Sequence, residues 1–174
     1  MKKRLLLSSI ATLSLVILGV VIFLALARDA APLPAVAIEQ PKVYTPEELL
    51  VEANKLRAEK GVPPLALDSG LNESARLKAE DMRVNKYYGH HNPVTDKKGY
   101  TIVYDVTGKQ CYGASENLAG VVSGGSPFDQ TYGWPASPAH YAAEIDPKYD
   151  TTGFAYDSFD GKPYYVQHFC DLAQ

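Results

Sequence analysis

The longest hydrophobic pattern in the chain is an unbroken apolar run near the N-terminus. Leu5–Ala27 spans twenty-three residues without a charge, and three basic residues come directly before it. A membrane-spanning helix needs about 20 apolar residues, whereas the apolar part of a secretory signal peptide has about 7–15. The run nevertheless ends in Ala-Leu-Ala, which fits a cleavage site. We therefore expect residues 1–27 to be a signal anchor or a signal peptide, with a hydrophobic helix that enters the membrane through residues 5–27.

The next segment, residues 28–44, has a different composition. It contains three prolines and several alanines without hydrophobic periodicity, which predicts an extended linker. Basic residues before an apolar segment keep that end in the cytoplasm. Residues 45–174 are therefore expected to form an extracytoplasmic domain, anchored by the N-terminal helix or secreted after cleavage near Ala27.

Two amphipathic helices are predicted at the start of this domain. Thr45-Pro46-Glu47-Glu48 is a capping box with proline at the first helical position, and Gly61 is a suitable stop. A second helix begins near Asp68 or Ser69 and ends near Asn85. Its apolar stripe has helical spacing and consists of Leu71, Ala75, Ala79 and Met82.

Strands and shorter helices follow in the second half of the domain. "GYTIVYDVT", residues 99–107, is rich in β-branched and aromatic residues and predicts a strand. Capping patterns predict a short helix from Ser126 towards Trp134 and another that begins after Ser137. The chain ends in a predicted hairpin, with its turn at residues 158–161. Helices first and strands last predict an α+β fold.

Charge and cysteine content narrow the classes of partner. The part of the chain after the apolar run has 14 basic and 20 acidic residues, a net charge of −6, and contains no basic cluster. Nucleic acid is therefore not expected as a partner. Cys111 and Cys170 are the two cysteines, and an even count outside the cytoplasm predicts a disulfide, the alternative being two unrelated thiols.

Aromatic residues gather in the same part of the chain. Eleven of the twelve tyrosines lie between Tyr87 and Tyr165. Their rings predict a tyrosine-rich face of the sheet, or alternatively a tyrosine-lined groove.

Three short segments contain residues suited to binding or catalysis. They are His90 and His91 in "YYGHHNP", Glu116 in "ASENLAG", and His140 in "WPASPAH". A surface histidine or a structural carboxylate is the ordinary interpretation of each segment alone. No Gly-x-Ser-x-Gly motif occurs, which argues against a serine hydrolase.

Taken in order, these segments resemble the bacterial branch of the CAP superfamily, also called the SCP/PR-1-like domain. "YYGHHNP" is similar to Tyr-Phe-Ser-His-x-x-Pro, which matches the family histidine to His90 rather than His91. "SENLA" resembles Gly-Glu-Asn-Ile-Ala, with Glu116 as its carboxylate. "WPASPAH" resembles Trp-x-x-Ser-Pro-Gly-His, with His140 as the second histidine. The resemblance covers about residues 46–170.

The resemblance implies an α-β-α sandwich with a cleft in which His90, Glu116 and His140 converge. Animal and plant members have a second glutamate where this chain has Ser137. The four cleft candidates are thus His90, Glu116, Ser137 and His140. The family mixes binding, lipid-carrying and protease roles, so the resemblance does not specify a reaction.

Two functions follow as hypotheses. The first is a binding module for an envelope or extracellular ligand. The second is a zinc-dependent hydrolase, because His90, His140 and Glu116 make up a three-ligand zinc set with an open position. His140 would be the third residue of its helix, where the helix dipole disfavours imidazolium. A third interpretation is that His90 and Glu116 only hold loops together by hydrogen bonds.

Overall fold

The computed structural model describes residues 42–103, 111–120 and 125–172. The predicted hydrophobic helix over residues 5–27 and nearly all of the linker lie outside the described residues. Within the described part, no helix is long and apolar enough to cross a membrane.

Both predicted amphipathic helices are present. Helix α2 spans Pro46–Glu59, and the side chains of Thr45 and Glu48 form the expected capping box. Helix α3 spans Ser69–Val84 and is capped by the side chain of Asp68, which accepts a hydrogen bond from Leu71 N. Their buried apolar residues recur three or four positions apart, so each helix presents one stripe to the core.

A four-stranded sheet forms the centre of the domain. Its strands are β1 (Ala66–Leu67), β2 (Gly113–Gly120), β3 (Thr151–Phe159) and β4 (Lys162–Asp171), in the spatial order β1-β3-β4-β2. The β3–β4 hairpin confirms the predicted one. Asp160 and Gly161 both have positive φ in its turn, as a two-residue hairpin loop of the type I′ class requires. Strand β2 is antiparallel to β4 and forms one edge of the sheet.

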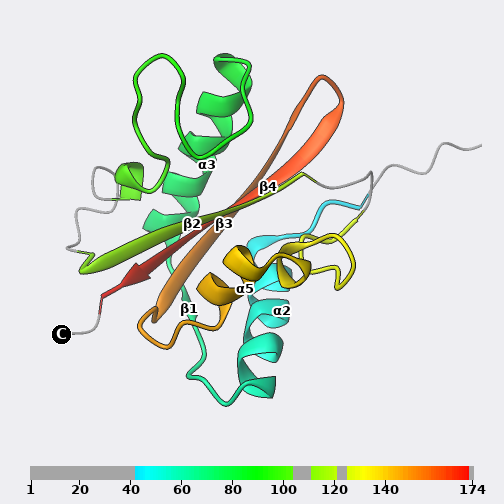
Figure 1. Ribbon diagram of the computed structural model, residues 1–174, viewed down its shortest axis with the longest axis vertical. Coiled ribbons are helices and arrows are strands. Elements are labelled where there is room, and N and C mark those ends of the chain that lie inside the picture. The colour runs from blue at the N-terminus through cyan, green and yellow to red at the C-terminus, as the bar shows by residue number, and fades with distance from the viewer. Residues whose placement is uncertain (1–41, 104–110, 121–124, 173–174) are drawn as a thin grey trace, which may run out of the picture. The chain divides into compact units, whose positions relative to one another are not determined.

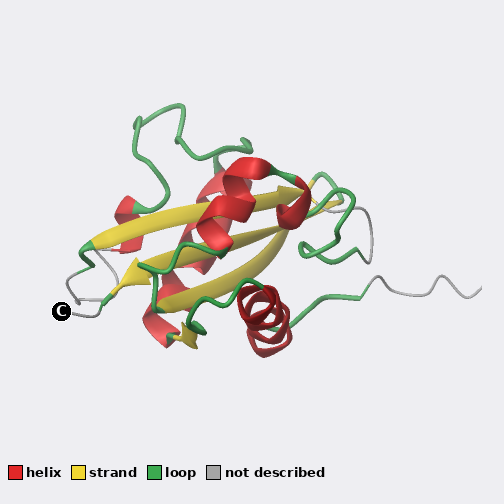
Figure 2. Cartoon of the chain, turned by 60° about the horizontal axis from the view of Figure 1, so that its bottom comes forward, coloured by secondary structure: helices red, strands yellow, loops and turns green. Residues whose placement is uncertain are grey.

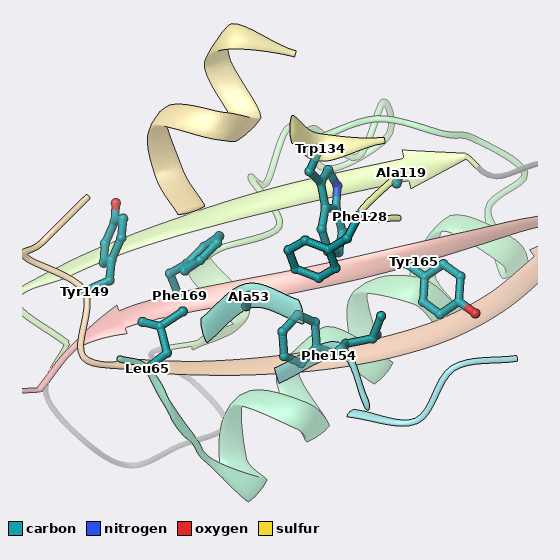
Figure 3. Close-up of a cluster of buried hydrophobic side chains, with 10 residues drawn as sticks. Ala53, Leu65, Ala119, Phe128, Trp134, Tyr149, Phe154, Tyr165 and Phe169 are labelled. Atoms are coloured by element: carbon teal, nitrogen blue, oxygen red, sulfur yellow. The ribbon is translucent and has the colours of Figure 1, made fainter. Parts of the chain in front are cut away.

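Helices cover both faces of the sheet (Figure 1). Helix α3 packs on the face formed by Leu118, Tyr164 and Val166. Helix α2 packs on the opposite face, where its Leu49 and Ala53 meet aromatic residues of β3 and β4 (Figure 3). Helix α5, Pro138–Glu144, lies on this second side with the 3₁₀ helix η1, Trp134–Ala136 (Figure 2). These elements form the mixed α+β fold that the sequence predicts.

Helix α3 lies directly against the backbone of β3. A Cβ atom added at Gly153 would lie 2.1 Å from the carbonyl carbon of Leu71 and 2.2 Å from the nitrogen of Asn72. The Asn72 side chain also accepts a hydrogen bond from Phe154 N at 2.8 Å. The absence of a side chain at Gly153 therefore allows the helix to approach the sheet this closely, which sets the position of residues on α3 relative to those on β4.

The predicted disulfide is also present. Cys111 and Cys170 are bridged, with their Cα atoms 5.5 Å apart. Both residues are buried in a small cluster with Leu71 and Val103. The bridge links the segment before β2 to β4, as the sequence predicts.

Two local predictions are wrong. Residues 99–103 form a turn and the start of a helix, in which Ile102 N bonds to Gly99 O and Val103 N to Tyr100 O. They are therefore not a strand, and residues 104–107 lie outside the described residues. Residues 126–133 form turns rather than a helix, because Asp129 Oδ1 accepts hydrogen bonds from the backbone at residues 131 and 132. The predicted helix after Ser137 is present as α5, with Ser137 at its N-cap position, although the Ser137 side chain makes no capping bond.

Candidate functional site

The loop that carries the two adjacent histidines is anchored on helix α3. The buried ammonium of Lys78 donates hydrogen bonds to Gly89 O at 2.7 Å and His90 O at 3.3 Å. Further along the loop, Asn92 Nδ2 donates to the carboxylate of Asp81. These bonds fix the backbone on both sides of His90 and so determine where its side chain points.

His90 and His91 have different surroundings. His90 Nδ1 lies 2.7 Å from Glu116 Oε1, whereas His91 Nδ1 lies 3.4 Å from the exposed Asp96. The side chain of His90 is 49% exposed and that of Glu116 only 1%. His90 thus has one nitrogen against a buried carboxylate, and the rest of its ring reaches the surface. This position agrees with the motif register, which selects His90 over His91.

Two further residues extend this contact into the core. His168 Nε2 lies 2.9 Å from Glu116 Oε2, and His168 Nδ1 lies 2.7 Å from Ser74 Oγ on α3. His168 and Ser74 are fully buried. The sequence motifs select neither residue. The β2–β4 register, which pairs Glu116 with His168 across the strands, is the signal that identifies them.

The environment of Glu116 favours its ionised form. Burial alone would raise the pKa of this carboxyl group. Hydrogen bonds with His168 and His90, together with the charge of Lys78, outweigh burial and lower the pKa of Glu116 below its ordinary value. The cleft is therefore built on a buried carboxylate that two imidazoles share.

His140 approaches the cleft from α5, on the opposite side of the sheet. Its ring centroid lies 6.3 Å from that of His90. Burial, with a smaller contribution from His90, lowers the pKa of His140. The expected neutral imidazole is thus favoured, with burial as a main cause. Ser137 lies three residues earlier at the start of α5, and no described hydrogen bond joins its side chain to His90, Glu116 or His140.

A pocket of about 320 Å³ opens beside His90 and Glu116. It is lined by His90, His91, Lys98, Tyr100, Ala114, Ser115 and Glu116. Its wall is close-packed, because a Cβ atom at Gly99 would lie 1.7 Å from Glu116 Oε2. Gly99 N also donates to His90 O at 2.8 Å. Gly99 therefore packs against both members of the His90–Glu116 pair.

Replacing Gly99 by Ala is expected to displace the Glu116 carboxylate from His90 and to lower the free energy of unfolding by about 1–3 kcal/mol, the usual cost of overpacking. Gly89→Ala is the matched control in the same loop, since a Cβ atom there has no neighbour within 4 Å. Urea denaturation of both variants measures the difference. Equal stability of the two variants would contradict the close packing at Gly99.

The other face of β2 carries a second buried polar cluster. Glu144, in the last turn of α5, accepts hydrogen bonds from Asn117 Nδ2 at 3.0 Å and Gln167 Nε2 at 3.3 Å. Asn117 Nδ2 also donates to His140 O at 3.2 Å. Asn117 and Gln167 are opposite each other across β2 and β4. This cluster therefore ties the helix that carries His140 to the sheet.

The buried tyrosines are divided between the two faces of the sheet, and a tyrosine-lined groove is also present. Tyr164 and Tyr165 are buried on opposite faces of β4. A separate pocket of about 340 Å³ is lined by Tyr87, Tyr88 and Tyr164 together with residues of the β3–β4 turn. This second pocket does not include the histidines or Glu116.

The residues of the cleft do not fit the zinc set of His90, Glu116 and His140. Both oxygens of Glu116 already serve imidazole nitrogens, and the carboxylate is almost inaccessible. Among the described residues, no group of three or more His, Cys, Asp and Glu side chains is arranged to hold a metal ion. In this arrangement the three side chains do not offer zinc a free set of ligands, and zinc binding by them stays a prediction.

Comparison with known proteins agrees with the fold. The uncharacterized protein YkwD of Bacillus subtilis (strain 168) is 29% identical over 116 residues, which are 63% of this chain and 42% of YkwD. An outer surface protein from Borrelia burgdorferi superposes with a TM-score of 0.62 at 19% identity, covering 73% of this chain and 92% of that one. An extracellular protein containing a SCP domain from Bacillus anthracis str. Ames gives a TM-score of 0.59 at 22% identity, covering 81% and 45%.

A match to a whole protein family covers most of the described domain. This chain spans less than half the length of YkwD, so the likeness concerns one part of that relative. Residues 50–169 match the cysteine-rich secretory protein family, CAP. These residues include His90, Glu116, His140 and the whole described sheet except the last two residues of β4. The chain therefore belongs to the CAP family.

Proposed function

We propose that this protein is an extracytoplasmic binding module whose ligand occupies the pocket beside His90. The observation that carries the proposal is a half-exposed imidazole held by a buried carboxylate at the wall of this pocket. Recognition sites commonly combine a few oriented polar groups with aromatic surface. Here His90 is the oriented group, and Tyr100 and Lys98 lie beside it.

Binding is favoured over nucleophilic catalysis by the partners of the two histidines. An activated nucleophile lies within hydrogen-bond reach of its base. No described serine or threonine hydroxyl is hydrogen-bonded to the side chain of His90 or His140. The described residues contain no free cysteine. The pocket thus has a candidate base or acceptor, but no described nucleophile is positioned beside it.

The extracytoplasmic part of the proposal has three supports. A disulfide persists in oxidising compartments. The Borrelia burgdorferi and Bacillus anthracis proteins with this fold are an outer surface protein and an extracellular protein. Residues 5–27 form a segment that is long and apolar enough to insert into a membrane. We infer that residues 5–27 direct the domain out of the cytoplasm.

Alkaline phosphatase fused after Gln174 tests the location, since this enzyme folds only where its own disulfides form. We expect activity from the full chain and loss of activity when residues 1–27 are deleted. A fusion that keeps Leu5–Ala27 but lacks the basic residues before them tests whether these residues set the orientation of the segment across the membrane. Equal activity with and without residues 1–27 would overturn the proposed location.

The His90→Ala variant is expected to lose ligand affinity about tenfold, because about 1.4 kcal/mol is within the range for one well-oriented hydrogen bond. Val94→Ala, at an exposed position of the same loop outside the pocket lining, should bind within about twofold of the parent. The measurement is a nuclear magnetic resonance (NMR) screen of hydroxyl- and amide-bearing fragments against the full chain in detergent micelles, followed by titration. Shifts that gather at the Tyr87–Tyr88–Tyr164 pocket instead would move the binding site away from His90.

A further inference from the structure

We propose that His168 is a positioning residue for the cleft. Through Glu116 it holds His90 in the tautomer whose Nδ1 carries the proton and whose Nε2 is a bare acceptor facing the pocket. The inference rests on the proposed function and narrows it, because a ligand of this cleft then has to bring a hydrogen-bond donor to His90.

The hydrogens around Glu116 determine the tautomer of His90. An ionised carboxylate offers only acceptors. Its two oxygens lie 2.7 Å from His90 Nδ1 and 2.9 Å from His168 Nε2. Both nitrogens therefore have to carry a hydrogen. For a neutral His90 this leaves Nε2 without one, and Nε2 has no hydrogen-bond partner among the described residues.

His168, held by Ser74, keeps the Glu116 carboxylate in place. His168 is fully buried between β4 and α3, and Ser74 Oγ lies 2.7 Å from its Nδ1. Ser74 is fixed in turn on α3, 3.0 Å from Leu71 O. The imidazole of His168 therefore cannot rotate freely, and its Nε2–H is directed at one oxygen of Glu116. The other oxygen is left for His90.

Lys78 does not replace His168 as a donor to Glu116, although its charge contributes to the ionisation of that carboxylate. Its ammonium has three hydrogens. They are directed at Tyr87 OH at 3.0 Å, Gly89 O at 2.7 Å and His90 O at 3.3 Å. Without His168, one oxygen of a carboxylate that is 1% exposed would lack a donor.

The unprotonated Nε2 of His90 determines the chemical class of the ligand. A bare Nε2 accepts from a hydroxyl or an amide N–H and repels an anionic oxygen. Lys98 and Tyr100 line the same pocket, with the Lys98 ammonium 5.7 Å from the centre of the Tyr100 ring. A hydroxyl-bearing ring or an amide group that stacks on Tyr100 suits this combination.

The tautomer is read directly from long-range proton–nitrogen NMR spectra of the full chain in detergent micelles at about pH 8, where ordinary imidazoles are neutral. We expect His90, assigned by its loss in His90→Ala, to show a single tautomer with Nδ1 protonated. His168→Leu is expected to populate the Nε2-protonated form of His90. His168→Gln, whose side-chain amide can donate to Glu116, should restore the parent tautomer. Val94→Ala, at an exposed position of the same loop outside the pocket, is the control and should leave the His90 signals unchanged.

Two results would overturn the inference. One is a parent protein in which His90 Nε2 carries the proton. The other is a folded His168→Leu variant with an unchanged His90 tautomer, which would make His168 only structural. If His168→Leu does not fold, Ser74→Ala replaces it, because it keeps the imidazole but removes the partner of Nδ1. Ser74→Ala should then show both tautomers of His90, and a single Nδ1-protonated form would count against the proposal.

Phenol and anisole test the ligand class, since they have the same ring but only phenol has a donor. Phenol at millimolar concentration should shift the His90 Nε2 resonance, and anisole should not. Equal shifts with both would overturn the donor requirement. If neither compound binds while the tautomer and its dependence on His168 are as expected, the positioning role stands and the proposed binding function fails.

Discussion

Replacing Glu144 by Gln is expected to stabilise the protein by about 4–5 kcal/mol at about pH 8 and by much less near pH 4. Burial raises the pKa of Glu144 to about 8, against an ordinary value of 4.5, despite hydrogen bonds from Asn117 and Gln167 and the charge of Arg57. Between these two values the folded chain holds a proton that the unfolded chain has released. Stability therefore falls as the pH rises from about 4.5 to about 8, and a residue that does not titrate removes this loss.

The surroundings of Glu144 accommodate the amide. Gln167 Oε1 is buried and lacks a hydrogen-bond partner in the described structure. A half-turn of the Gln167 amide would allow it to accept from the new NH₂ group, in exchange for the present contact of Gln167 Nε2 with Thr152 Oγ1. The measurement is urea denaturation of Glu144→Gln and the parent at several pH values between about 4 and 9. Glu52→Gln, at an exposed position of α2, is the control and should show no such pH-dependent gain. A stability difference that does not grow with pH would contradict a protonated Glu144.

Reduction of the Cys111–Cys170 disulfide is expected to lower the free energy of unfolding by about 4 kcal/mol. The bridge closes a loop with a sequence separation of 59 residues, and the chain-entropy model gives that value for a loop of this length. Domains of this size have a total stability of about 5–15 kcal/mol, so the loss is a large part of the whole.

Chemical denaturation with and without a thiol reductant measures this effect. Cys170 is almost fully buried, so the reductant has to be added in denaturant and the chain refolded in its presence. A double Cys111→Ala, Cys170→Ala variant is the control. It should match the reduced parent apart from the small change in side-chain volume, and it should not respond to reductant. An unchanged denaturation midpoint of the reduced parent would show that the bridge adds little stability.

Local sequence signals predicted the elements that depend on local interactions. The capping box at Thr45 and the stripes of α2 and α3 involve residues close in sequence, and so does the Asp-Gly turn at residues 160–161. Strand β2 was missed because its neighbouring residues Glu116 and Asn117 are both polar and both buried. The usual alternation of apolar and polar residues is therefore absent from this strand.

The prediction of a strand at residues 99–107 is wrong for a different reason: the composition of this segment is typical of a strand, but its structure is not. Its β-branched and aromatic composition favours a strand only where a partner strand is available. In the described part, bonds such as that from Val103 N to Tyr100 O close helical turns instead.

The candidate site was predictable only in part, because some of its contacts join residues far apart in the chain. Family motifs placed His90, Glu116 and His140, and the structure brings the first two into contact. The contribution of His168 and Ser74 depends on the pairing of β2 with β4 and on the close approach of α3 to Gly153. Those are contacts between residues far apart in the chain, which no local pattern reports.

The two polar clusters on opposite faces of β2 also specify how this edge strand pairs. Glu116 faces His168 on one side of the sheet, and its neighbour Asn117 faces the Glu144 cluster on the other. A slip of one residue against β4 would turn every β2 side chain to the opposite face. It would place Asn117 near Ser74 and a second carboxylate, that of Glu116, near Glu144, so that two acids would share one buried site. A slipped pairing is thus disfavoured because the ionised Glu116 would lose its two imidazole partners inside the core, in addition to the lost packing. This protects an edge strand that is short of apolar residues from incorrect pairing during folding.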